Sequence, residues 1–153
     1  MLIVSPVFAG ELWTEDFAAA KKTAAKEEKD LLLNFSGSDW CGWCQKLDKE
    51  VFDQESFKPK ATKEYVMVKL DFPRKTPQSD EIKKQNRALQ RKYGVRGFPT
   101  ILLADSDGEI YARTGYQKGG PEKYLTHLAE LQKNKEQRDA LEKKIENTDG
   151  AKK

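Results

Sequence analysis

Both cysteines of this 153-residue chain, Cys41 and Cys44, lie in one Cys-x-x-Cys motif. The motif follows the apolar run 31–35, which is typical of a buried β-strand. Two intervening residues on the first turn of a helix bring two sulfurs close enough to form a disulfide without moving the backbone. The spacing and its surroundings therefore predict a dithiol redox site.

The two thiols are predicted to have different roles because only one of them lies at the start of the helix. A helix N-terminus favours negative charge, so we expect the pKa of the Cys41 thiol in the range of about 3.5–7.5 seen for such pairs. Cys44, one turn further, is expected to be buried and protonated at rest. Cys41 then attacks a disulfide, and Cys44 resolves the product.

Three other interpretations of the pair are open: a structural disulfide, half of a zinc site, or two unrelated core cysteines. A structural zinc ion needs four ligands, and beyond the two thiols the chain offers only His127. A zinc site would therefore require two chains to share the metal. The strand before the pair and the helix after it favour redox chemistry, with no metal and no cofactor besides the Cys41–Cys44 disulfide itself.

Composition predicts one domain and excludes two classes of function. The chain is 37% hydrophobic and 35% charged, which suits a single compact core. Its 28 basic and 25 acidic residues are spread along the whole length, so we expect no nucleic-acid partner. No run approaches the roughly eighteen apolar residues of a membrane span. We expect a monomer.

The first ten residues are apolar and end their hydrophobic stretch in Val7-Phe8-Ala9. This pattern is similar to the end of a signal peptide, although a basic start and a full apolar core are missing. A leader would predict a periplasmic or secreted protein. The alternative is an edge strand, which leaves a cytoplasmic location open, because one cysteine pair says nothing about the compartment.

Periodicity predicts alternating helices and strands. Thr14 is predicted to cap a first helix that includes Trp13 on its apolar face, and Pro59 is predicted to interrupt a short helix over 55–63. The remaining predictions are strands over 31–35 and 65–71, a helix over 45–52, a loop over 73–80, a helix that Gly94 ends, a hairpin over 100–113 and a last helix from Pro121. The domain is predicted over 11–132, followed by a charged extension over 133–153 that is helical or frayed.

This order predicts an α/β fold with a mixed sheet of about four to five strands and helices on both faces. The cysteine pair would lie beyond the carboxyl end of its strand, where open α/β sheets place their sites.

The chain resembles the thioredoxin superfamily, and more closely its disulfide reductase and isomerase branch. Two motifs carry the resemblance: Ser36 to Cys44, which ends in Trp-Cys-Gly-Trp-Cys, and Val95 to Thr100, which contains Gly-Phe-Pro-Thr. The resemblance covers residues 11–132 and implies a thioredoxin-like fold. It also implies a cis bond before Pro99 beside the disulfide, and a glycine after the last strand, Gly115, that keeps a substrate groove open.

The matched residues imply a surface for a polypeptide substrate. Trp40 and Trp43 offer flat apolar area around the sulfurs, and Gly42 allows another chain to approach. If the bond before Pro99 is cis, the backbone of Phe98 points outward, where an extended segment can pair with it.

One position departs from the thioredoxin pattern. Where many thioredoxins carry an Asp that helps to move the proton of the resolving thiol, this chain has Asn34, followed by a loop one residue longer. Lys69 matches the lysine on the neighbouring strand. Since an amide cannot accept a proton at neutral pH, proton transfer would fall to water, Asp39 or Lys69.

The resemblance implies thiol–disulfide exchange with cysteine-containing protein substrates and a recycling partner that the sequence does not identify. The pair between the cysteines, Gly42-Trp43, is neither the Gly-Pro of strong reductants nor the Gly-His of isomerases, so the direction of exchange stays open. Two alternatives remain: a non-catalytic thioredoxin-like binding module, and a redox sensor that contacts its partner through the segment after Lys133.

Overall fold

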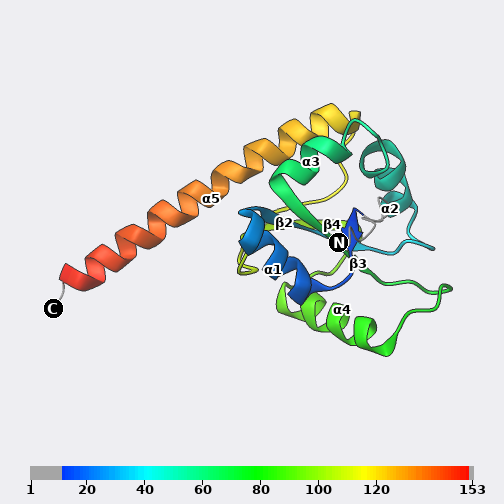
Figure 1. The fold of residues 1–153 in the computed structure, drawn as a ribbon, viewed down its shortest axis with the longest axis horizontal. Coiled ribbons are helices and arrows are strands. Elements are labelled where there is room, and N and C mark those ends of the chain that lie inside the picture. Colours follow the sequence, from blue (N-terminus) through cyan, green and yellow to red (C-terminus); the bar gives the residue numbers. More distant parts are fainter. Residues whose placement is uncertain (1–11, 152–153) are drawn as a thin grey trace, which may run out of the picture.

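The computed structural model describes residues 12–151 of the chain as a central sheet with helices on both faces (Figure 1). The five strands are β1 (Trp13–Thr14), β2 (Asp30–Ser36), β3 (Tyr65–Asp71), β4 (Thr100–Ala104) and β5 (Ile110–Thr114). The helices are α1 (Phe17–Glu27), α2 (Gly42–Leu47), the π-helical continuation η1 (Asp48–Phe52), α3 (Lys58–Glu64), α4 (Asp80–Lys92) and α5 (Gly120–Ala151). The predicted α/β class and mixed sheet are confirmed.

The sheet has the order β1-β3-β2-β4-β5, with β2 at its centre. β2 pairs with β3 in parallel over its whole length, from Asp30 opposite Tyr65 to Ser36 opposite Asp71. On its other side it pairs antiparallel with β4, where Phe35 lies opposite Thr100. The carboxyl end of β2 therefore lies beside the end of β3 and the start of β4.

Alternating side chains of the strands build a separate core on each face of the sheet. Leu32, Met67 and Ile101 face α2, η1, α3 and α5, which contribute Leu47, Phe52, Ala61, Tyr124 and Leu128. Leu31, Leu33 and Leu102 face α1 and α4, which contribute Phe17, Ala20, Ala24 and Leu89. Because both faces of β2 are covered, its apolar residues follow one another along the strand instead of alternating with polar ones, as in other buried strands.

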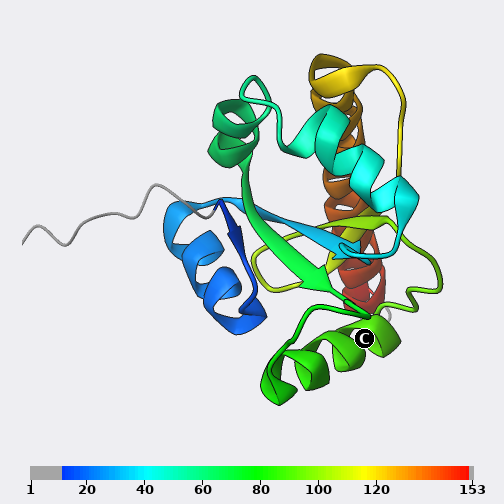
Figure 2. The same ribbon diagram turned by 90° about the vertical axis from the view of Figure 1, so that its right-hand side faces the viewer.

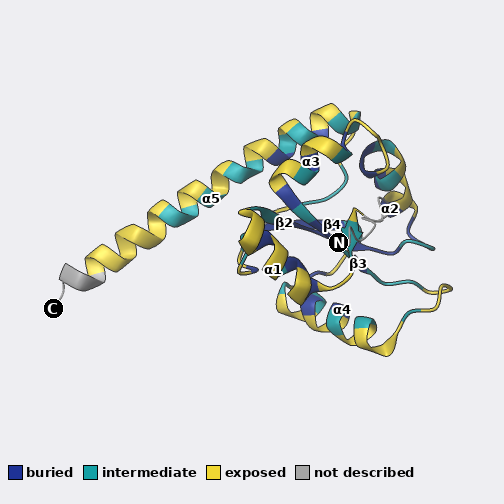
Figure 3. Ribbon diagram, viewed as in Figure 1, coloured by how far each residue is buried: buried dark blue, intermediate teal, exposed yellow. Residues whose placement is uncertain are grey.

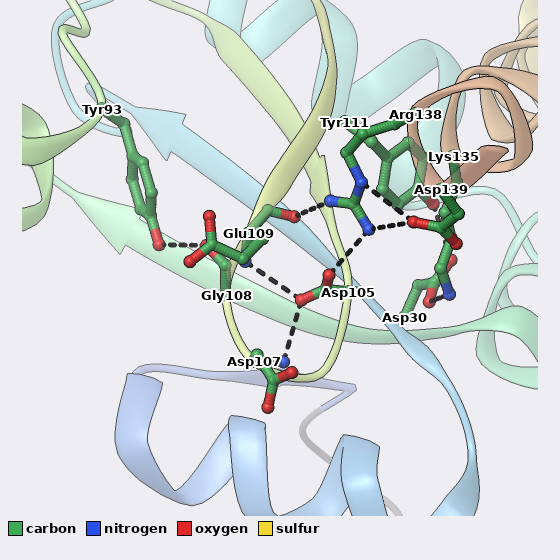
Figure 4. Close-up of polar contacts among 10 residues, drawn as sticks. All are labelled: Asp30, Tyr93, Asp105, Asp107, Gly108, Glu109, Tyr111, Lys135, Arg138 and Asp139. Atoms are coloured by element: carbon green, nitrogen blue, oxygen red, sulfur yellow. Dashed lines mark hydrogen bonds and ion pairs between the residues drawn. The ribbon is translucent and has the colours of Figure 1, made fainter. Parts of the chain in front are cut away.

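Helix α5 continues beyond the body of the protein (Figure 1). Lys135 forms a salt bridge of 2.9 Å with Asp30, and Arg138 forms one of 2.9 Å with Asp105 in the turn between β4 and β5 (Figure 4). Beyond these anchors, residues 140–148 are exposed (Figure 3). The predicted boundary at residue 132 thus falls inside one helix, and the described part of the predicted extension is helical.

Two local predictions are wrong. Thr14 does not cap α1; Trp13 and Thr14 pair with Met67 and Val68 as β1, and the Asp16 carboxylate accepts the capping bond from the Ala19 N–H at 3.0 Å. A strand of two residues has no period that a sequence pattern can detect. Pro59 lies in the first turn of α3 rather than interrupting a helix, since that position needs no N–H donor. The predicted segment 1–10 lies outside the described residues.

Candidate active site

The cysteine pair lies beyond the carboxyl end of β2, at the start of α2. Cys41 is the N-cap residue of α2, and Cys44 is on its first turn. The two are joined by a disulfide, with 5.2 Å between their Cα atoms. Cys41 is 7% exposed and Cys44 only 1%, so Cys41 is the more accessible of two nearly enclosed residues. Figure 2 looks onto the end of the molecule that carries α2.

Each sulfur accepts a hydrogen bond from a backbone N–H. The Cys44 N–H donates to Cys41 Sγ at 3.2 Å, and the Gly37 N–H donates to Cys44 Sγ at 3.5 Å. N–H donors directed at a sulfur stabilise a thiolate more than a thiol, because the bond strengthens when the acceptor carries a charge. The start of α2 is therefore built to hold negative charge on Cys41 once the disulfide opens.

The loop before β4 packs beside the cysteine loop. The bond between Phe98 and Pro99 is cis, as the resemblance implied. The Phe98 ring contacts the Trp40 ring edge-on, with 5.7 Å between centroids. A Cβ added to Gly115 would lie 3.2 Å from the Pro99 carbonyl oxygen, so a glycine allows these two backbones their close approach. Phe98, Pro99 and Gly115 are thus brought together with the cysteine loop.

Trp40 is held in one position from several sides. Its indole Nε1 donates to the Phe72 carbonyl at 2.7 Å, and its ring lies over Gly37 so closely that a Cβ there would overlap it. The sequence predicted flat apolar surface around the sulfurs from both tryptophans. In the structure, only Trp40 is fixed by the surrounding loops.

Trp43 lies on the other side of the pair and is 58% exposed. Its ring tilts against Tyr116, with 5.1 Å between centroids, and the Lys46 ammonium lies 5.1 Å from the Trp43 ring centroid. Gly42 is exposed, and a Cβ there would meet nothing within 4 Å. This side of the site is open apolar surface of the kind that a polypeptide substrate can cover.

A polar cluster lies beneath α2 on the same face of the sheet. Asn34 and Lys69 are opposite each other on β2 and β3, and Asn34 is buried with its Oδ1 unpartnered. Lys69 Nζ lies 3.8 Å from a carboxylate oxygen of Asp48. Burial raises the pKa of Asp48, and the nearby Lys69 charge opposes that rise. Asp48 is one helical turn after Cys44, and its backbone N–H donates to the Cys44 carbonyl.

Asp48 is the residue that the sequence interpretation missed. Its position four residues after Cys44, on a predicted helix, was the available signal, because residues four apart share one face of a helix.

Asp39 has a different environment from the one expected of a proton acceptor. Its carboxylate accepts the backbone N–H groups of Arg74, Lys75 and Thr76, which hold the pKa of that carboxyl well below its usual range.

A cavity of about 340 Å³ reaches the same cluster from the β1 edge of the sheet. Trp13, Phe52, Asp53 and Lys69 are among the residues that line it. Solvent therefore has access to Lys69 from a side of the sheet that the cysteine loop does not cover.

A cysteine pair at a helix start, beside a cis-proline loop at one end of a mixed five-stranded sheet, defines a thioredoxin-like dithiol site. The chain belongs to the thioredoxin-like family, whose domain it matches over residues 17–143. It is 35% identical over 123 residues to the disulfide bond reductase DsbH of Chlamydia pneumoniae, covering 80% of this chain and 74% of that protein. It is 36% identical over 101 residues to the thioredoxin-related protein DsbJ of the same organism, covering 65% of this chain and 29% of DsbJ.

The solved structures agree with the sequence comparison. A structure of a DsbH oxidoreductase superimposes with a TM-score of 0.76 at 33% identity, covering 87% of this chain and 92% of that one. The prediction of a thiol–disulfide oxidoreductase is thereby confirmed. His127, the further ligand available to the zinc alternative, lies on α5 with its Nε2 2.7 Å from the Thr114 hydroxyl.

The contact between Gly37 and Trp40 predicts the effect of a single added methyl group. We expect Gly37→Ala to lower the free energy of unfolding by about 1–3 kcal/mol, because the Cβ would overlap a ring that its neighbours hold in place. Gly97→Ala is the matched control: a Cβ there meets nothing within 4 Å, so its effect should stay within about 0.5 kcal/mol. Denaturant unfolding followed by tryptophan fluorescence measures both. Equal effects of the two variants would show that Trp40 is not held as described.

Proposed function

We propose that the chain works as a reductase of disulfides in protein substrates. The observation that supports this direction most directly is the similarity to a protein named as a disulfide bond reductase. The backbone N–H bond to Cys41 Sγ supports the attacking role of Cys41, because it stabilises the thiolate that attacks a substrate disulfide. The exposed ring of Trp43 and the half-buried Phe98 in the cis-proline loop suit an extended polypeptide.

The proposed reaction proceeds in two exchanges. The Cys41 thiolate attacks one sulfur of the substrate disulfide, which forms a mixed disulfide and releases the other substrate sulfur as a thiolate that takes a proton from solvent. Cys44 then loses its proton and attacks Cys41 Sγ. The substrate leaves as a dithiol, the protein keeps the Cys41–Cys44 disulfide, and two electrons have moved to the substrate. A thiol-donating partner must reduce the protein again.

We further propose that Asp48 accepts the proton of Cys44 in the second exchange, in place of the Asp that Asn34 replaces. Asp48 follows Cys44 by one helical turn, and its pKa is raised by burial, which makes it a better proton acceptor than an ordinary carboxylate. Lys69, paired with Asp48, lines the cavity at the β1 edge, so water can reach this pair and take the proton. Asp39 is left as an anchor of the neighbouring loop.

The order of attack predicts opposite outcomes for the two cysteine variants. Cys44→Ser should accumulate a mixed disulfide with a reducible protein substrate, because no thiol remains to release it. Cys41→Ser, in which the attacking thiol is absent, should form none. Non-reducing electrophoresis with mass spectrometry measures both adducts. Trapping by Cys41→Ser and not by Cys44→Ser would reverse the assigned roles.

The role of Asp48 predicts a change in the pH profile of the second exchange. Asp48 accepts a proton only when ionised, so the release rate should fall as pH drops through its raised pKa. Asp48→Asn should slow release about tenfold or more near neutral pH and remove this acid limb. Asp107→Asn, in the turn between β4 and β5, is the control. Stopped-flow decay of a preformed mixed disulfide provides the rates, and an unchanged profile in Asp48→Asn would exclude this role.

We propose that the protein is exported to the periplasm or secreted. The support is the apolar stretch that ends in Val7-Phe8-Ala9, which is similar to the end of a signal peptide. None of the helices within residues 12–151 combines the length and the apolar character that crossing a bilayer requires. Fractionation of cells that express the natural gene product should recover it outside the cytoplasm. Recovery in the cytoplasm with the apolar stretch uncleaved would contradict export.

A further inference from the structure

The surface next to Cys41 combines fixed aromatic rings with a fixed cation. We call it the Trp40 platform: Trp40, Phe72, Arg74 and Phe98. The Arg74 guanidinium lies over the Trp40 ring, with its Cζ 3.8 Å from the ring centroid. Phe72 and Phe98 pack against each other with 5.1 Å between centroids, and Phe98 contacts Trp40. Because Trp40 directly precedes Cys41 in the sequence, this cation is held against the residue next to the attacking cysteine.

The cysteine loop itself holds Arg74 in this position. The Asp39 carboxylate accepts the backbone N–H groups of Arg74 at 2.9 Å and of Lys75 and Thr76 at 2.8 Å. Ser38 donates its backbone N–H to the Asp71 carboxylate at 2.9 Å. Ser38 and Asp39 both lie in the loop between β2 and Cys41. This loop therefore clamps the segment that carries Arg74.

The charge that this end of the molecule offers to a substrate is positive. Arg74, Lys75 and Arg96 are exposed, and none of them forms a salt bridge with a carboxylate within residues 12–148. The Asp39 carboxylate is already occupied by backbone N–H groups of residues 74–76, and the Asp71 carboxylate is occupied by Ser38 of the cysteine loop. The charges of the two carboxylates are therefore met by these donors, whereas the three cations are exposed.

We propose that the Trp40 platform selects extended cysteine-containing segments that carry acidic side chains near the cysteine. This inference rests on the proposed reductase function and specifies its substrate class. An acidic side chain beside the substrate cysteine meets Arg74 when the mixed disulfide with Cys41 forms. A planar guanidinium stacked on an indole is well suited to this contact, since the ring fixes its orientation and leaves its N–H edge free for a carboxylate.

The test uses disulfide-linked homodimers of one short peptide whose cysteine has Glu, Gln or Lys on both sides. Mixing each with the fully reduced protein gives the second-order rate constant of the first exchange from tryptophan fluorescence. The readout is the ratio of the Glu rate to the Lys rate in each protein variant. Comparing this ratio between variants cancels the effect of the neighbours on the intrinsic reactivity of the peptide disulfide.

Arg74→Gln should lower this ratio about threefold, the size expected for one exposed charge pair. Arg74→Lys should give a ratio between those of Arg74→Gln and the unmodified protein, because an ammonium keeps the charge but cannot stack flat on the indole ring. Arg91→Gln is the matched control and should leave the ratio unchanged. It lies in the last turn of α4, close to Tyr93, whose hydroxyl donates to the Gly108 carbonyl in the hairpin turn at the opposite end of the sheet.

The Asp39→Asn variant distinguishes an effect of the position of Arg74, which Asp39 holds, from an effect of net charge alone. Removing a negative charge near the site would by itself raise the ratio of Glu to Lys rates. Releasing the loop that holds Arg74 should lower it, and a lower ratio is the expected result. A higher ratio in Asp39→Asn, or the same ratio in Arg74→Gln as in the unmodified protein, would overturn the inference. If none of the three peptides is reduced, the reductase function itself fails.

Discussion

Every part of the site depends on the pairing of β2 with a neighbour on each side. β3 and β4 satisfy the backbone hydrogen bonds of β2, and two separate cores cover its faces, so β2 is fixed along its whole length. Where β2 ends, the chain leaves the sheet between the end of β3 and the start of β4. This one point brings together the cysteine loop, the loop that carries Arg74 and the cis-proline loop, which are far apart in the sequence.

The chemistry of the site follows from the backbone N–H groups that stabilise negative charge at this junction. The backbone N–H groups of Gly37 and Cys44 are directed at sulfurs, and three further N–H groups are directed at the Asp39 carboxylate. Negative charge is thereby stabilised at a reactive position and at a structural one, a few residues apart. The two tryptophans form different parts of the remaining surface. Trp40 is fixed under the Arg74 guanidinium, and Trp43 is exposed to a substrate.

The sequence predicted the features that depend on strong local patterns. The apolar run of β2, the cysteine spacing and the hairpin were recoverable, because each depends on residue types at fixed separations. The cis bond before Pro99 was implied only by the resemblance to the thioredoxin superfamily. Features that depend on contacts between distant segments were not. β1 has only two residues, so the local pattern around Thr14 indicates a helix cap instead of a strand. The roles of Asp48 and Asp39 depend on Lys69 and on the loop over 74–76. The burial and the hydrogen-bond partners of a carboxylate decide its role, and neither can be predicted from the residues next to it in the sequence.

The central claim is that the Cys41–Cys44 disulfide opens and closes as a reductase site. The most direct test equilibrates the protein in glutathione and dithiothreitol buffers and follows the fluorescence of Trp40 and Trp43. The account predicts one two-electron transition with a potential nearer to about −270 mV than to about −120 mV. A potential near −120 mV would identify an oxidant instead. A disulfide that shows no transition over the whole series would be a structural clip, and that result would contradict the account.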